Sequence, residues 1–119
     1  MSNYKLSFRK PPSEIEINLN SSKSESNRLL IIESLSDNQI ELENLSQAND
    51  TVLLKNLIKS NSENIWDAED AGTTMRFLTS FLAVTKQGVL LTGTKRMKKR
   101  PIKILVDALN KIGAQISYN

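Results

Sequence analysis

Two cations and three serine hydroxyls lie within the segment Ser22–Arg28, directly before apolar residues at helical spacing. Serine side chains can cap the free backbone N–H groups at the start of a helix, and the helix start itself favours an anion. Lys23 and Arg28 add full positive charges at this position. The segment is therefore typical of a phosphate-binding turn, although the same residues also suit an ordinary capped helix with solvated charges.

A second candidate anion site is the segment Asp70–Thr74, between a short apolar strand and an apolar helical pattern. Because Gly72 has no side chain, a ligand can approach its backbone closely, and the following N–H groups point out of the helix start. Arg76, one turn later, could equally be a structural ion-pair partner. Taken alone, this segment is more simply an ordinary strand-to-helix turn.

The third candidate is the basic loop Thr92–Pro101, in which Arg100 directly precedes the proline expected to open the last helix. An arginine there can direct two hydrogen bonds at a phosphate or carboxylate. The alternatives are a solvated basic loop and charge-driven binding of nucleic acid. Against the latter, the basic run contains no aromatic residue on which a base could stack.

The composition excludes several kinds of chemistry. The 119 residues contain no cysteine and no histidine, which excludes disulfides and cysteine nucleophiles and removes the commonest general base and metal ligand. We expect neither a metal nor a cofactor. Residues 95–119 carry seven Lys/Arg against one acid, whereas residues 1–94 carry nine against twelve. This asymmetry is typical of an exposed loop, an anion site or a nucleic-acid contact.

No apolar run approaches the ~20 residues that span a bilayer, and residues 1–10 lack the apolar stretch of a signal peptide. We therefore expect a soluble, cytoplasmic protein. Its length suits one compact domain or part of a larger one.

Alternating apolar residues predict strands, and apolar residues at helical spacing predict helices. Strands are expected at residues 4–8, 15–19, 40–42, 65–66, 89–91 and 116–118. Helices are expected at residues 24–35 and from a cap at Ser46 or Asp50 through Ile58. Two more are expected, one that follows the turn Asp70–Thr74, contains Met75 to Val84 and stops at Gly88, and one from Pro101 to a stop at Gly113. This order predicts an α/β (α+β) fold with sheets backed by helices.

Together, the three candidate sites resemble one enzyme family. The motifs are Ser-Lys-Ser-x-Ser-Asn-Arg at 22–28, Asp-Ala-Gly-Thr-x-Met-Arg at 70–76, Leu-Thr-Gly at 91–93 and Arg-Met-Lys-x-Arg-Pro-Ile at 96–102. In order and spacing they are similar to 3-phosphoshikimate 1-carboxyvinyltransferase (5-enolpyruvylshikimate-3-phosphate synthase), the shikimate-pathway enzyme that glyphosate inhibits. The related UDP-N-acetylglucosamine enolpyruvyl transferases match less well, because they usually rely on a cysteine that this chain lacks.

The resemblance implies a role for five residues. Lys23 would be catalytic and would contact both substrates, phosphoenolpyruvate and shikimate 3-phosphate. Ser24 and Arg28 would bind shikimate 3-phosphate, and Gly72 and Arg100 would bind phosphoenolpyruvate. The implied reaction joins the enol carbon of phosphoenolpyruvate to the 5-hydroxyl of shikimate 3-phosphate and then eliminates phosphate, and it requires no metal.

Three positions depart from the family pattern. Ser21 replaces a glycine, Lys99 stands where an acid is frequent, and Phe77 replaces a proline. Because Phe77 lies near a helix that affects inhibitor fit in the family, the substitution puts glyphosate sensitivity in question.

The chain is also much shorter than members of the family, which have two domains of repeated βαβαββ units. The resemblance assigns residues 1–20 to the domain completed by a missing C-terminal part. Residues 21–119 would form an incomplete substrate-binding domain, with one unit and the start of a second. We expect this piece to be inactive alone and to self-associate through uncovered apolar surface. A non-catalytic module that retains the anion sites is an alternative, and a basic nucleic-acid-binding domain is a weaker one.

Overall fold

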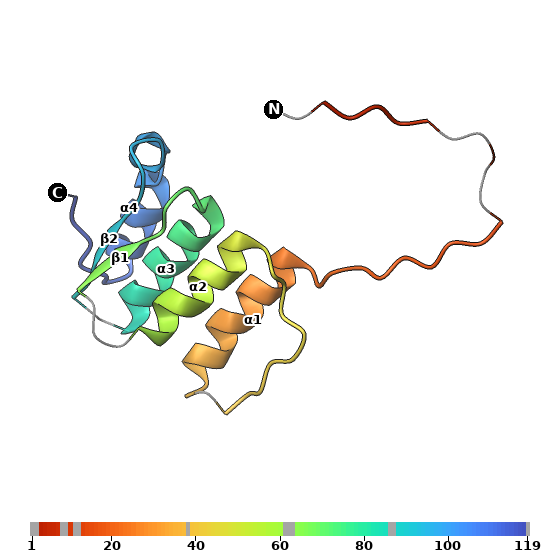
Figure 1. Ribbon diagram of the computed structural model, residues 1–119. Coiled ribbons are helices and arrows are strands. Elements are labelled where there is room, and N and C mark those ends of the chain that lie inside the picture. Colours follow the sequence, from red (N-terminus) through yellow and green to blue (C-terminus); the bar gives the residue numbers. More distant parts are fainter. Residues whose placement is uncertain are drawn as a thin grey trace.

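A computed structural model describes residues 3–7, 10, 13–37, 39–60, 64–85 and 88–118. It combines helices and strands, as the sequence predicted (Figure 1). In chain order the elements are α1 (Lys23–Leu35), α2 (Asn49–Lys59), β1 (Ile65–Asp67), α3 (Gly72–Thr85), β2 (Leu90–Thr92), the 3₁₀ turn η1 (Met97–Lys99) and α4 (Lys103–Lys111).

The two strands form a parallel pair joined by α3. Trp66 of β1 lies opposite Leu91 of β2. A parallel pair needs a long crossover, and α3 provides it by packing on the strands. Because the carboxyl ends of both strands lie at the same edge, the loop before α3 and the loop after β2 leave the sheet together.

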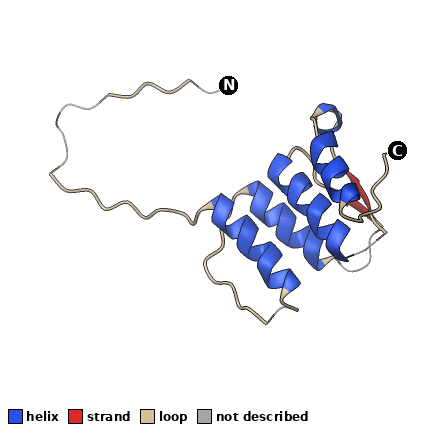
Figure 2. Cartoon of the chain, turned by 180° about the vertical axis from the view of Figure 1, so that it is seen from behind, coloured by secondary structure: helices blue, strands red, loops and turns tan. Residues whose placement is uncertain are grey.

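Three helices form a layer in which α2 lies between α1 and α3, and α4 packs on the other side of α3 (Figures 1 and 2). The helices and Trp66 enclose the hydrophobic core, which consists of Leu30, Leu54, Leu57, Trp66, Leu78, Phe81 and Leu82. The sequence has few aromatic residues, so leucines supply most of this core.

The helix ends agree with the sequence in part. Ser22 caps α1, because its hydroxyl accepts a hydrogen bond from the Glu25 N–H at 3.3 Å. Gly113 ends α4 with φ +106°, a conformation that favours glycine. The predicted caps of α2 are wrong: the cap residue is Ala48, which makes no side-chain cap bond. α4 also begins two residues after Pro101, at Lys103.

Several predicted strands are absent from the described residues. Residues 3–7 and 14–20 form no strand, and neither do residues 39–43. Phe8, predicted at the end of the first strand, lies outside the described part. At the C-terminal end, the side-chain amide of Asn110 donates to the carbonyl of Ile116 and accepts from its N–H, both at 2.9 Å. These bonds occupy backbone groups that a strand ladder would need.

An extended arm precedes α1 and runs away from the helices (Figure 1). Its alternating residues Ile15, Ile17 and Leu19 are 63–87% exposed. The radius of gyration is 18.5 Å, against about 13.5 Å for a compact domain of this length. The arm therefore carries a strand-like apolar pattern without a partner surface in the described structure.

Candidate anion-binding site at the helix N-termini

The first turns of α1, α2 and α3 meet at one end of the helix layer. Lys23, the first residue of α1, forms an ion pair with Asp50 in the first turn of α2, with 3.4 Å between Nζ and Oδ2. The buried hydroxyl of Thr74, in the first turn of α3, donates to the backbone carbonyl of Asp50 at 3.0 Å. Three positive helix ends therefore lie next to one another, an arrangement that favours bound anions.

The predicted residues of α1 all lie at this end of the helix. The Nη1 of Arg28 donates to the carbonyl of Ser24 at 3.1 Å, which returns the guanidinium towards the helix start. Lys23, Ser24 and Arg28 are all exposed, and Lys23 pairs with Asp50. Exposed ion pairs contribute only ~0–1 kcal/mol, so the main effect of Asp50 is to orient Lys23.

Gly72 and Arg100 lie in contact although they are far apart in the sequence. A side-chain carbon built on Gly72 would lie 3.0 Å from Cζ of Arg100, which is closer than such atoms normally approach. The guanidinium therefore fills the space that any other residue at position 72 would occupy. This brings a forked cationic donor group to the first residue of α3, where backbone N–H groups lack helical partners.

Arg76 has a structural role in the free protein. Its Nη1 donates to the carbonyl of Gly72 at 3.1 Å, and its Nη2 donates to the carbonyl of Pro101 at 3.3 Å. The same side chain thus fastens the start of α3 to the segment that follows Arg100. The sequence suggested a structural ion-pair partner as one alternative for Arg76; among the described residues its partners are backbone carbonyls and not an acid.

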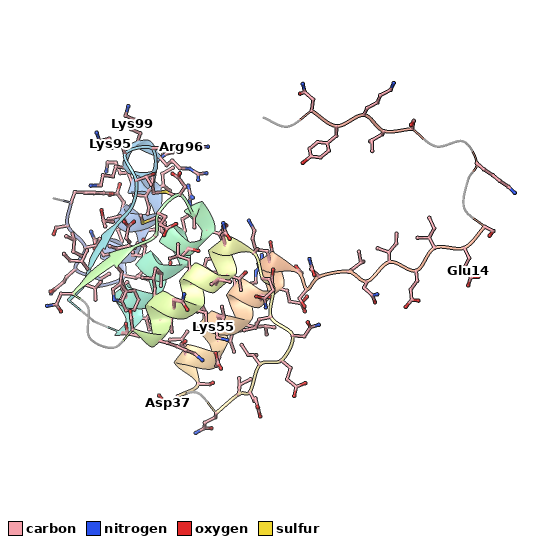
Figure 3. The ribbon with its side chains drawn as sticks, viewed as in Figure 1. Glu14, Asp37, Lys55, Lys95, Arg96 and Lys99 are labelled. Carbon is pink, nitrogen blue, oxygen red and sulfur yellow. The ribbon has the colours of Figure 1, made fainter. Side chains whose placement is uncertain are left out.

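The other cations of the basic loop point outward. Figure 3 shows Lys95, Arg96 and Lys99 projecting from the turn between β2 and α4, and Lys98 is also exposed. Among the described residues, none of these four forms an ion pair. Their charges add to the positive potential at the end of the molecule where Arg100 contacts α3.

Sequence reasoning missed two features of this region. Asp50 entered only as a possible helix cap, and nothing in its local pattern indicated the pairing with Lys23. Asn27 is completely buried, and both polar atoms of its side chain, like the hydroxyl of the buried Thr51, have no hydrogen-bond partner in the described structure. The sequence could have indicated this buried polar group, because Asn27 is a polar residue at a helical position that faces the core.

The structure shows what surrounds the three residues that depart from the family pattern. The Ser21 hydroxyl donates to the carbonyl of Asn44, which ties the entrance of α1 to the loop before α2. Phe77 is half-buried and packs against the hydrophobic core. Lys99 is exposed at the tip of the basic turn.

One ionisable group outside the site is perturbed. A hydrogen bond from Lys103 to Asp107, 2.6 Å long, and the attraction of the Asp107 charge raise the pKa of Lys103 above its ordinary value of 10.5. Both residues lie on the first turns of α4, so the pair is a local helix contact.

Within the described ranges, no helix has the length and apolar character needed to cross a membrane. In the same residues, His, Cys, Asp and Glu side chains do not gather in groups of three that could hold a metal ion.

Comparison with known proteins identifies relatives of this chain. The family model for EPSP synthase (3-phosphoshikimate 1-carboxyvinyltransferase) matches residues 54–119. A protein of that name from Bacteroides fragilis strain YCH46 is 49% identical over 110 residues, which are 90% of this chain and 26% of the relative. Another, from Buchnera aphidicola subsp. Cinara cedri, is 37% identical over 128 residues, 87% of this chain and 29% of the relative.

The chain therefore spans about a quarter of the length of these relatives. No solved structure matches it. The family match covers more than half of the chain and includes both the turn before α3 and the basic loop. These matches show that the chain belongs to the EPSP synthase family.

Proposed function

We propose that this chain supplies part of the substrate cleft of a 3-phosphoshikimate 1-carboxyvinyltransferase. The reaction transfers the enolpyruvyl group of phosphoenolpyruvate to the 5-hydroxyl of shikimate 3-phosphate in the shikimate pathway. The observation that carries the proposal is the position of Arg100 against Gly72 at the start of α3, on the same end of the helix layer as Lys23. Both implied substrates are anions that such an end attracts.

Different residues of the site suit different substrates. Gly72 and the N–H groups that follow it, together with the fork of Arg100, suit the phosphate or carboxylate of phosphoenolpyruvate. Ser24 and Arg28 suit the phosphate of shikimate 3-phosphate. Lys23 lies at the start of α1 next to the first turn of α2, where its ammonium can contact both ligands once it leaves Asp50.

The implied chemistry needs charge stabilisation and positioning. The 5-hydroxyl gives up its proton as its oxygen bonds to C2 of phosphoenolpyruvate, and a proton is added to C3, which gives a tetrahedral intermediate. Loss of a proton from C3 and of phosphate from C2 then restores the double bond. The cations of this chain hold the two anions together and stabilise the departing phosphate. The groups that move protons are expected outside this chain.

The arm and the sheet fit a larger assembly. We infer that residues 1–20 complete a second domain and that residues 21–119 belong to a domain of repeated βαβαββ units, of which β1–α3–β2 would be a central part. The exposed alternating residues of the arm and the short, two-stranded sheet support this view. The missing C-terminal part would be the partner that covers both.

The first test is a titration of the chain with shikimate 3-phosphate, followed by backbone amide NMR. We expect specific shifts at Lys23, Ser24 and Arg28 that inorganic phosphate does not reproduce. Equal effects of both ligands would count against the assignment to this half-site. Binding that ignores shikimate 3-phosphate, accepts nucleic acid and weakens steeply with salt would favour the nucleic-acid-binding alternative.

The isolated chain should not catalyse the reaction, because the proposed site contains only part of the cleft. The measurement is phosphate release from the two substrates at the highest soluble protein concentration. Sustained release above the rate of a Lys23→Ala control would overturn this expectation.

A further inference from the structure

The loop before α3 and the loop after β2 are joined by one side chain, that of Thr94. Its hydroxyl donates to the Asp70 carboxylate and accepts the Met97 N–H at 3.3 Å. Its backbone N–H donates to the carbonyl of Glu69 at 3.2 Å, and its carbonyl accepts the N–H of Lys98 at 3.0 Å. Thr94 therefore bonds to both loops at once.

These bonds fix the turn that presents Arg100. The N–H of Arg100 donates to the carbonyl of Met97 at 2.9 Å, so Arg100 continues directly from the turn that begins at the Thr94 hydroxyl. Met97 is 4% exposed, and its side chain packs against Gly93, where an added side-chain carbon would lie 2.8 Å from Cγ of Met97. The orientation of this turn thus depends on Thr94 at one end and determines where the guanidinium lies at the other.

The position of Asp70 is unexpected for a carboxylate close to an anion site. A carboxylate two residues before Gly72 carries a negative charge next to a site proposed to bind anions, where it opposes binding. Its hydrogen bond with Thr94 gives it a compensating role, because that bond ties the start of α3 to the turn that carries Arg100.

We propose that Thr94 and Asp70 are positioning residues: their hydrogen bond holds the loop of Arg100 against the start of α3 and so keeps the guanidinium over Gly72. Neither residue needs to touch substrate. The identity of the ligand, phosphoenolpyruvate, rests on the proposed function. The geometry rests only on the hydrogen bonds described above.

The test compares Thr94→Val with Thr94→Ser. Thr94→Val keeps the shape and the bonds of the Thr94 backbone but removes the hydroxyl, and with it the bonds to Asp70 and to the Met97 N–H. Thr94→Ser keeps the hydroxyl. The first readout needs no ligand: NMR cross-relaxation between side-chain protons of Arg100 and the α-protons of Gly72. We expect this signal in the original chain and in Thr94→Ser, and we expect its loss in Thr94→Val. Persistence of the signal in Thr94→Val would overturn the inference.

The second readout is the dissociation constant for phosphoenolpyruvate, with inorganic phosphate as a separate probe. Loss of the hydrogen bond to the charged Asp70, together with the weaker one from the Met97 N–H, should weaken binding of phosphoenolpyruvate by about tenfold in Thr94→Val. The effect should be less than about twofold in Thr94→Ser, which keeps the hydroxyl. Equal affinities in the original chain and Thr94→Val would refute the positioning role. If the original chain binds neither probe, the proposed function fails for this piece, and the cross-relaxation signal still decides the inference.

Asp70→Ala provides an independent variant if Thr94→Val does not fold. It should lose the same cross-relaxation signal. The double variant should show no further change relative to Thr94→Val, because Thr94→Val already removes the bond to Asp70. Amide shifts in α1 and α2 serve as the control for intact structure. A retained signal in folded Asp70→Ala would contradict the proposal.

Discussion

The absent side chain of Gly72 makes room for the guanidinium of Arg100. Neither residue is distinctive alone, since glycine is common in turns and arginine is common in basic loops. Their contact creates a site in which backbone donors and a planar cation face the same space. The proposed function therefore depends on the contact between these two residues, which lie far apart in the sequence.

Gly72→Ala should separate stability from binding. The added methyl group meets only the tip of a flexible side chain, so Arg100 can move aside, and alanine is the better helix former by at most about 1 kcal/mol. We expect an unchanged or slightly raised free energy of unfolding and at least about tenfold weaker binding of phosphoenolpyruvate. Chemical denaturation and an NMR titration measure the two quantities.

The matched control for Gly72→Ala is Gly88→Ala, because none of the described residues places an atom within 4 Å of a side-chain carbon built at Gly88. That variant should bind like the original chain. If Gly72→Ala bound phosphoenolpyruvate normally, the close approach of Arg100 would have no part in recognition.

At the scale of elements, two loops that leave the same edge of the sheet pack on each other. Gly93 makes this packing possible, since a side-chain carbon there would lie 2.7 Å from the backbone carbonyl oxygen of Glu69 and 2.8 Å from Cγ of Met97. The first of these neighbours is backbone and cannot swing away. The packing of the two loops therefore depends on Gly93.

Gly93→Ala should destabilise the fold, in contrast to Gly72→Ala. Overpacking against backbone typically costs about 1–3 kcal/mol, and we expect a loss of free energy of unfolding in that range, measured by urea denaturation. Gly88→Ala again provides the control. An unchanged midpoint in Gly93→Ala would mean that the two loops separate at little cost.

The pair on α4 makes a pH-dependent contribution. Because the pKa of Lys103 is raised above 10.5, the stabilisation from its hydrogen bond with Asp107 is fully present below that value and is lost as the pH rises through the raised pKa. Asp107→Asn should lower the pKa of Lys103 towards 10.5, as followed by the NMR shifts of its side chain. A titration curve identical in both proteins would show that the bond does not persist in solution.

The sequence predicted elements well where the signal was local. α1 and α3, β1 and β2, the Ser22 cap and the Gly113 stop follow from periodicity and from the backbone preferences of serine and glycine. The arm was predicted as strands because alternation is a local pattern, but a strand also needs a neighbour, and the described residues provide none. The amide of Asn110 likewise takes the backbone groups of Ile116, which no periodicity could indicate.

For the site, too, the sequence indicated local features but not contacts between distant residues. The candidate residues and the helix starts that carry them could be located from the residue types, and the family resemblance assigned them roles that remain predictions. The partners that hold these residues could not be located in this way. Asp50 contacts Lys23, and Thr94 contacts Asp70, across 27 and 24 positions of sequence.

At the scale of the whole molecule, the arm and the helical body are nearly independent. The described arm residues are exposed, and the core lies entirely between α1 and the sheet. Burial of apolar surface is the main source of stability, and the arm buries almost none. The body should therefore hold its structure without the arm.

Deletion of residues 1–20 should leave the thermal midpoint of the body unchanged within about 2 °C, since a loss of 1 kcal/mol would shift it by ~4–8 °C. The radius of gyration from small-angle X-ray scattering should fall from 18.5 Å towards about 13 Å. A clear drop in the midpoint would show that the arm folds back onto the body in solution.

The arm enters α1 directly at Ser22, the residue that caps the helix next to Lys23. Any partner that orders the arm and thereby alters this cap will change the affinity of the Lys23 site. By thermodynamic reciprocity, a ligand at Lys23 must change the affinity for that partner by the same factor. If the anion site proposed at Lys23 binds its ligand, the junction at Ser22 links that binding to the binding of the arm by a partner, and each can be measured through its effect on the other.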